Sequence, residues 1–464
     1  MRWSSRWFLA STLALGLSVV WFRPGPTLLI GGDAGCYGRV GRELAERPVS
    51  SWLELTLGRE PFFEHPPLGL WVTGAAVATA GPSPAALVGL ARWYASLTLI
   101  VLAAAAAQLV ARRGTMTDPL DGPTLAGFSV LGALTLPGFL YESQVAMLEA
   151  PLGLALAVGL WATTGMMRSV TRLEAPFPTP AVLVFVASIV LGFWVKGPPV
   201  AVLLGVLLVA TTLRWIPVRV AFVATVASLG AVIVSTWGFD ALRTSRGLEP
   251  FFARYLERQV LASMTEGRHN ADPNPLFYVR PTLSWYGPAV AAAGLAVLAL
   301  GLRRRVRWLA RVRVEAMVLG ASLWLGVVVG FSLPVQKYQW YVHPGLVGAA
   351  LLVGSVLALV PARLDRWLGV ACVVGAVCWP LVRFVPWEER LTPTQRHLAA
   401  LQAATGPSPG DAIADCSPMD WWVSGHLMGF LWDARRVDCD QPAPWTFDGQ
   451  ALVARRGGAR APGP

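Results

Sequence analysis

Long apolar runs separated by short polar connections are the feature that most restricts how this 464-residue chain can fold. A helix needs about 20 apolar residues to cross the hydrocarbon layer, because lipid offers the backbone no hydrogen-bond partners. Charged residues make up 14% of the chain, whereas about a quarter is usual in a soluble protein. The sequence therefore predicts an all-α polytopic membrane protein. We place eleven membrane-spanning helices at residues 7–22, 85–111, 124–141, 150–167, 180–195, 197–213, 220–238, 281–302, 314–333, 341–360 and 367–383.

The basic residues predict how these helices are oriented. Lys and Arg outnumber Asp and Glu by 38 to 27, but they stand in small clusters between apolar runs, which argues against a nucleic-acid partner. Threading the spans in order puts the clusters on one side, which the positive-inside rule makes cytoplasmic. They are Arg2 with Arg6, Arg112 with Arg113, Arg168 with Arg172, Arg214 with Arg219, the arginines of 303–313, and Arg363 with Arg366. The outer side receives the segments 31–84, 142–149, 239–280, 334–340 and 384–464.

The tail differs in kind from the rest of the chain. We therefore expect a transmembrane domain at 1–383 and a small extracytoplasmic α/β domain at 384–464, which at about 80 residues is only marginally stable alone. Its predicted elements are a helix at Leu391–Ala404 and strands at Asp411–Cys416, Arg435–Cys439 and Ala451–Arg455.

The five cysteines are too widely spaced for a zinc site or a disulfide scaffold. Cys416 and Cys439 each end a strand-like segment on the oxidising side, so we expect a disulfide between them. We expect Cys36 to be free, and Cys372 and Cys378 to be buried in the last span.

The first outer segment carries polar groups at both of its ends. Asp33 is expected at the N-cap of an amphipathic helix that runs to Leu44 along the membrane interface. Capping alone explains an Asp at that place. Further on, Glu64 and His65 precede two prolines, which fix an extended turn at the membrane surface. A solvated loop rim is the plainer interpretation of that turn.

Other outer residues have both a structural and a functional interpretation. Glu149 stands where a helix begins and is favoured there by the helix dipole, yet an ionisable group among apolar residues at the membrane edge is a functional candidate. Lys196 precedes Gly-Pro-Pro and can simply extend its ammonium to the interface. Lys337 and Tyr341 join two spans among aromatic residues typical of the interface. Arg258 lies on a second amphipathic helix, 249–261.

Together these residues form one layer of acids, cations and aromatic rings at the outer surface. Such a layer suits a substrate with a lipid tail and an anionic phosphate head.

At these residues the sequence resembles the GT-C class of polytopic glycosyltransferases, in particular the aminoarabinose transferase and protein O-mannosyltransferase group. Asp33 matches the first-loop acid of that group, and Glu64-His65-Pro66-Pro67-Leu68 matches its Glu-Lys-Pro-Pro-Leu turn. The further matches are Glu149-Ala150-Pro151-Leu152, Lys196-Gly197-Pro198, Ser332 with Lys337, Tyr341 and Pro344, and Arg92 with Ser96. The sequence departs from the group at Ala34, the usual second acid, and at His65, the usual lysine.

The resemblance implies an inverting transferase that moves a sugar from a polyprenyl-phosphate donor to an envelope acceptor, on the outer side of the inner membrane. It makes Asp33 and Glu149 the catalytic candidates, with Asp33 as general base. The substrate-binding candidates are Glu64, His65, Arg92, Lys196, Arg258, Lys337 and Tyr341.

No nucleotide-binding or metal-binding motif is present, although a divalent metal near Glu64 and His65 stays open, as do the sugar, the acceptor and the oligomeric state. A lipid or sugar transporter, or a scaffold subunit without activity, is the alternative. A transporter is expected to carry ionisable groups near the bilayer midplane on broken helices, whereas this chain keeps them at one surface.

Overall fold

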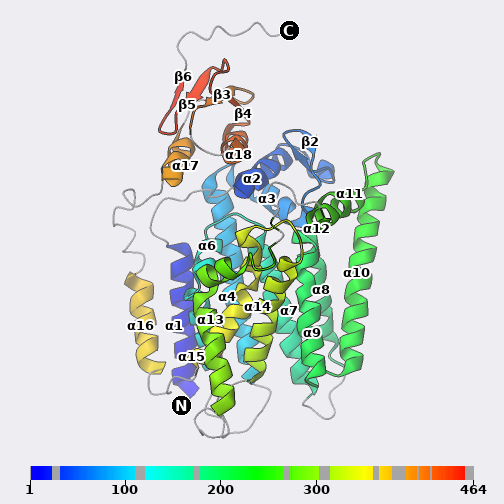
Figure 1. Ribbon diagram of the computed structural model, residues 1–464, viewed down its shortest axis with the longest axis vertical. Coiled ribbons are helices and arrows are strands. Elements are labelled where there is room, and N and C mark those ends of the chain that lie inside the picture. Colours follow the sequence, from blue (N-terminus) through cyan, green and yellow to red (C-terminus); the bar gives the residue numbers. More distant parts are fainter. Residues whose placement is uncertain are drawn as a thin grey trace.

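The computed structural model describes most of the chain as a helical bundle with smaller elements at one end (Figure 1). The described residues are 2–22, 32–110, 121–170, 177–265, 272, 274–302, 314–358, 365–378, 393–404, 407–417 and 421–454.

Six helical stretches among these residues are long and apolar enough to cross a membrane, which supports a multi-pass membrane protein. They are α4 (Pro84–Val110), α7 (Glu149–Val170), α8 (Thr179–Lys196), α10 (Val218–Ser245), α14 (Val314–Ser332) and the run of η6 (Gln339–Gly345) with α15 (Leu346–Leu357). The other predicted spans overlap helices outside these six, so their number stays a prediction. These are α1 (Arg2–Trp21), α5 (Gly122–Leu134) with α6 (Pro137–Glu142), η3 (Pro198–Ala201) with α9 (Val202–Thr212), α13 (Val279–Leu302) and α16 (Asp365–Cys378).

Close packing inside the bundle depends on glycines. A Cβ added to Gly354 of α15 would lie 2.5 Å from the Cα of Ser129 in α5, and one added to Gly348 would lie 2.5 Å from the carbonyl oxygen of Gly320 in α14. Such contacts between small residues are how helices associate in lipid, where apolar burial gives no driving force. In contrast, α10 leaves Phe222, Ile233 and Trp237 about two-thirds exposed or more, which suits contact with acyl chains.

The first outer segment forms several short elements at one end of the bundle (Figure 1). They are α2 (Gly32–Ala45), η1 (Val49–Ser51), the antiparallel strands β1 (Thr56–Leu57) and β2 (Glu60–Pro61), and α3 (Pro67–Ala80). We did not predict α3, which is apolar but too short to span, and which begins at Pro67. The outer segment 239–280 forms α11 (Phe251–Tyr255), the π-helix η4 (Leu256–Leu261) and α12 (Ala262–Thr265).

The tail forms a four-stranded mixed sheet with two helices. Its elements are α17 (Pro393–Ala403), β3 (Ala412–Asp415), α18 (Trp421–Trp432), β4 (Arg435–Asp438), β5 (Trp445–Phe447) and β6 (Leu452–Ala454). The strand order is β4-β3-β5-β6, with β3 parallel to both neighbours and β6 antiparallel to β5. We predicted β3, β4 and β6 from the sequence but missed β5 and α18.

The predicted disulfide between Cys416 and Cys439 is confirmed. Cys36 and Cys372 are free and buried, as expected, whereas the side chain of Cys378 lies outside the described part of the chain. The predicted domain boundary at 383 also lies outside the described residues, so the division of the chain stays a prediction.

The tail shares one hydrophobic cluster with the first outer segment. Leu427 and Phe430 of α18 pack with Ala34 of α2 and Leu87 of α4, and α18 lies beside α2 in Figure 1. Glycines allow this approach, because a Cβ on Gly38 would lie 3.0 Å from the Phe430 ring. The tail therefore helps to hold the helix that carries Asp33.

Candidate functional site

A buried ion pair joins the outer ends of α7 and α8. The Lys196 ammonium, at the last residue of α8, contacts the carboxylate of Glu149, at the first residue of α7, and their side chains are 6% and 0% exposed. Each charge sits at the helix end whose dipole favours it. Lys196 also lies 5.2 Å from the ring centroid of Tyr341, and the Tyr255 hydroxyl donates to the Lys196 carbonyl at 3.3 Å.

The sequence after Lys196 explains how the pair is presented. Gly197 ends α8 with φ 79°, in a region that residues with a Cβ rarely adopt. A Cβ there would also collide with the Tyr255 hydroxyl. Pro198 then prevents α8 from continuing, so the chain turns immediately below the ammonium.

Asp33 belongs to the same cluster. Burial raises its pKa from 3.8 to about 6, and the negative charge of Glu149 adds to the rise while Lys196 opposes it. Glu64 contributes a further, smaller rise, so it also lies near. The N-cap position we predicted for Asp33 is wrong, because α2 already begins at Gly32 and Asp33 therefore lies in its first turn.

His65 reaches the cluster through Tyr37. The Tyr37 hydroxyl and His65 Nε2 share a hydrogen bond of 2.9 Å, and their rings meet edge to face. The first outer segment thus places two groups near the Glu149–Lys196 pair. One is Asp33 of α2, and the other is the Glu64-His65 turn that precedes α3.

A cavity of about 390 Å³ opens beside this cluster. Its polar lining includes His65, Lys196, Tyr255 and Tyr341, and two contacts already described join Lys196 to both tyrosines. Its apolar wall comes from α9, η4, α12, α14 and the residue after α14: Val202, Val260, Met264, Gly326, Val327, Gly330, Phe331 and Leu333. Gln259, on the π-helix, also lines the cavity, and its buried side-chain oxygen has no hydrogen-bond partner among the residues that the structure describes. The arrangement suits an apolar chain with a polar head.

Two predicted binding residues, Arg92 and Lys337, donate hydrogen bonds to other groups of the protein, and a third, Arg258, lies on the π-helix η4. Arg92 donates to Gln144 Oε1 at 3.0 Å, and Gln144 in turn donates to the Val20 carbonyl, so this contact braces the second outer connection against α1. Lys337 is buried and donates to the carbonyls of Asp272 and Pro334 at 2.6 and 2.8 Å. Arg258 lies on η4, with its guanidinium 5.8 Å from the ring centroid of Phe63.

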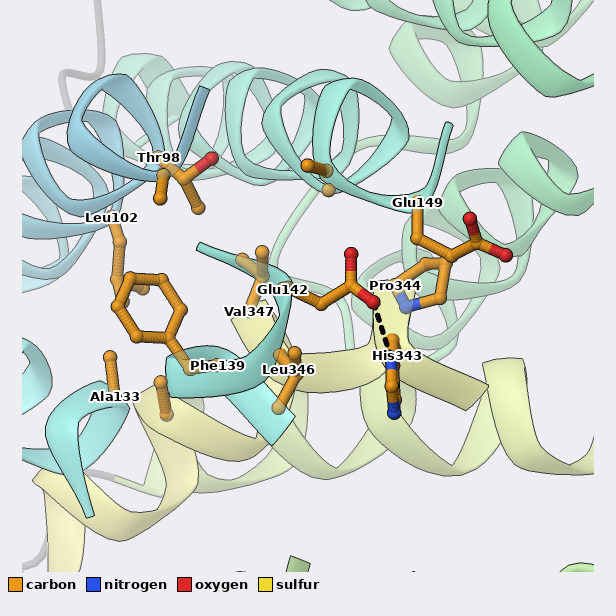
Figure 2. Close-up of a pocket in the computed structure, with 14 residues that line it drawn as sticks. Thr98, Leu102, Ala133, Phe139, Glu142, Glu149, His343, Pro344, Leu346 and Val347 are labelled. Carbon is orange, nitrogen blue, oxygen red and sulfur yellow. Dashed lines mark hydrogen bonds and ion pairs between the residues drawn. The ribbon is translucent and has the colours of Figure 1, made fainter. Parts of the chain in front are cut away.

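Sequence reasoning missed a second buried acid–base pair. Glu142, the last residue of α6, contacts His343 of η6, and both side chains are buried (Figure 2). With Glu149 they line a cavity of about 30 Å³. The one available signal was that His343 lies inside the Lys337–Pro344 element that carried the resemblance. Among the described residues no group of three His, Cys, Asp or Glu side chains is arranged to hold a metal ion.

Solved structures with this architecture exist. A crystal structure of ArnT from Cupriavidus metallidurans bound to undecaprenyl phosphate aligns with a TM-score of 0.57 at 16% identity, covering 94% of this chain and 86% of that one. The fold is ArnT-like. The apo structure of the same protein aligns with a TM-score of 0.60 at 17% identity, covering 94% of this chain and 85% of that one.

The predicted GT-C resemblance is therefore confirmed at the level of the fold. No protein-family model matches the sequence, and no curated protein matches it.

Proposed function

We propose that this chain is an integral-membrane glycosyltransferase that moves a sugar from a polyprenyl-phosphate donor to an envelope acceptor. The observation that carries the proposal is the buried Lys196 ammonium beside two carboxylates at the polar lining of an apolar cavity. The ArnT-like fold supports it, since one of those ArnT structures holds undecaprenyl phosphate. We place the protein in the inner membrane, with this end of the bundle on the outer side.

The donor's lipid tail would lie along the apolar wall of the cavity, and its phosphate would approach Lys196. As the bond between the anomeric carbon and the lipid phosphate breaks, positive charge develops on the sugar and negative charge on the phosphate. A preorganised ammonium in a water-poor site stabilises the second charge, and nearby carboxylates stabilise the first. Attack opposite the leaving phosphate inverts the anomeric carbon.

Asp33 acts as general base toward an acceptor hydroxyl. A base works best when its pKa lies near the working pH, and burial raises the pKa of Asp33 to about 6. The carboxylate is thus still ionised at neutral pH but more basic than an exposed Asp. Glu149 orients the Lys196 ammonium, and Arg258 is a second cation for the phosphate. Lys196 takes precedence over Lys337 because Lys196 lines the cavity, whereas Lys337 is not among the lining residues and donates to two carbonyls.

The test is transfer by purified protein in lipid nanodiscs. The donors are polyprenyl-phosphate hexoses and aminopentoses, the acceptors are envelope lipid and glycan extracts, and mass spectrometry detects the products. We expect transfer from at least one donor, with Lys196→Ala losing far more activity than Lys337→Ala. Absence of transfer from every such donor, or full activity of Lys196→Ala, would contradict the proposal.

A further inference from the structure

The Glu142–His343 pair has features that packing alone does not require. The two residues are 201 positions apart in the sequence and come from α6 and η6, and both side chains are nearly fully buried, at 7% and 0% exposed. Burying an ion pair costs more than burying apolar residues of similar size, so such a pair is poorly explained by stability.

This pair shares its small cavity with Glu149. Three buried polar atoms of the three residues have no hydrogen-bond partner within the described part of the chain: Glu142 Oε2, Glu149 Oε2 and His343 Nε2. The cavity of about 30 Å³ has room for about two water molecules, each needing about 10–15 Å³. In Figure 2 the three side chains gather at one end of the cavity, while Phe139 and Leu102 lie at the other. Water at the polar end would bridge the orphaned atoms.

Charge balance gives the pair a role. Lys196 supplies one positive charge against the two carboxylates of this cavity, Glu142 and Glu149, and Asp33 adds a third negative charge beside Glu149. The buried volume therefore favours at least one more proton. His343 can hold that proton, because its Nδ1 faces Glu142 and its ring is edged by Tyr141 and Trp285, with centroids 5.6 and 5.0 Å away. With the proton on His343, both carboxylates stay ionised.

Few other titratable groups face this cavity. Tyr141 comes from α6 and Glu149 from α7, and the hydroxyl of Tyr286 in α13 is already bonded to the Val342 carbonyl. In α14 the one charged residue is Glu315, in the first turn, and α15 carries no charged residue. Beyond the cavity, Asp33 of α2 lies near Glu149 and has a pKa raised to about 6. The groups that can hold the proton are therefore His343, Glu142, Glu149 and Asp33.

We propose that Glu142 and His343 are a positioning pair for the transferase site, in which His343 holds the proton that keeps Glu149 ionised and paired with Lys196. The inference rests on the proposed function. Without His343 the balancing proton would move to a carboxyl group, and a protonated Glu149 would release the Lys196 ammonium from its position.

The test compares pH profiles of kcat in purified protein for His343→Gln, Glu142→Gln and the double variant. We expect His343→Gln to lower kcat at pH 7 by about tenfold, with recovery at higher pH, because the acidic limb moves up from about 6 by roughly two pH units. Adding Glu142→Gln also removes one negative charge, which offsets the lost positive charge of His343. The acidic limb of the pH profile of the double variant should therefore return to its wild-type position. Thr98→Val alters the same cavity wall without changing a charge and should leave the limb in place.

A second readout needs no substrate. Infrared titration of the protonated-carboxyl band should show one more protonated carboxyl at neutral pH in His343→Gln than in the wild type or the double variant. If no donor supports transfer, the proposed function fails and this titration still tests the pair. An unchanged carboxyl band in His343→Gln, or a double variant as impaired as His343→Gln, would overturn the inference.

Discussion

At the residue scale, the account depends on what ionised side chains do beside one another in a buried place. Asp33 and Glu149 stood out in the sequence because acids are rare at the edges of apolar runs, and their proximity to Lys196 is what the fold adds. Glu142 and His343 could not be paired from the sequence, since no local spacing links residues 201 positions apart. Arg92 and Lys337 matched motifs, yet their described hydrogen bonds go to protein groups.

Asp33→Asn separates catalysis from structure. Because folding raises the pKa of Asp33 from 3.8 to about 6, its stabilising contribution is present below pH 3.8 and is lost as the pH rises through about 6. Ionised Asp33 then costs about 3 kcal/mol of stability at neutral pH. The amide should therefore raise Tm at pH 7 while lowering kcat by roughly 10²–10⁴-fold.

Thermal unfolding and transfer assays on the same preparation measure both effects. In the wild type, kcat should fall as the pH drops through about 6. A variant that keeps its activity on a hydroxyl acceptor would show that Asp33 is not the base.

The Glu149–Lys196 pair should show strong coupling. Lys196→Met leaves a buried carboxylate without its partner and should cost about 3–5 kcal/mol of stability, whereas adding Glu149→Gln should recover most of that loss. Transfer should stay lost in both, because the ammonium is absent. Tm values of the two single variants and the double variant check this, and additive losses would show that the pair is not coupled.

At the element scale, apolar runs predicted where helices lie better than where they break. The predicted span 124–141 is divided into α5 and α6 because Pro137 begins a new helix, and 341–360 begins with a 3₁₀ segment that contains Pro344. The helix α3 was missed because its run is shorter than a span and follows two prolines. Counting apolar residues over about 20 positions locates a membrane span, but it does not locate the prolines that divide the span into separate helices.

Two glycine substitutions test how α8 presents Lys196. Gly197→Ala forces a Cβ into a left-handed conformation and toward the Tyr255 hydroxyl, so it should cost about 1–3 kcal/mol or more and reduce transfer. Gly205→Ala in α9 meets open space and should stabilise its helix by up to about 1 kcal/mol. Gly197→Ala should thus lower both Tm and the transfer rate, whereas Gly205→Ala should raise Tm and leave the transfer rate unchanged. Equal behaviour would contradict the described role of Gly197.

At the scale of the whole molecule, the sequence predicted a helical bundle with its functional groups at one end. The described helices form such a bundle, and Asp33, Glu149 and Lys196 lie close together in it. The tail was predicted as a separate unit, yet its α18 packs on α2 through a shared hydrophobic cluster. Composition indicates that a segment is not membrane-spanning, but it does not reveal which surface that segment covers.

The predicted orientation is testable by cysteine labelling. In a background that lacks Cys36, Cys372 and Cys378, Ser50→Cys should react with an impermeant thiol reagent in intact spheroplasts, and Trp308→Cys should react only after lysis. This follows from the arginine clusters on the predicted cytoplasmic side. Labelling of position 308 but not of position 50 would place the candidate site on the wrong side of the membrane for the proposed reaction.

The central claim is that the cavity beside Lys196 holds the lipid of a polyprenyl-phosphate donor. Gly330 lines this cavity and meets open space, whereas Gly294 of α13 meets open space away from its described lining. The deciding measurement is the KM for the lipid-linked donor in Gly330→Phe and Gly294→Phe, side by side with the wild type. The account predicts a KM raised about tenfold or more in Gly330→Phe, since a phenyl ring displaces part of the lipid and each tenfold change is about 1.4 kcal/mol of binding, with Gly294→Phe unchanged. A wild-type KM in Gly330→Phe would contradict it.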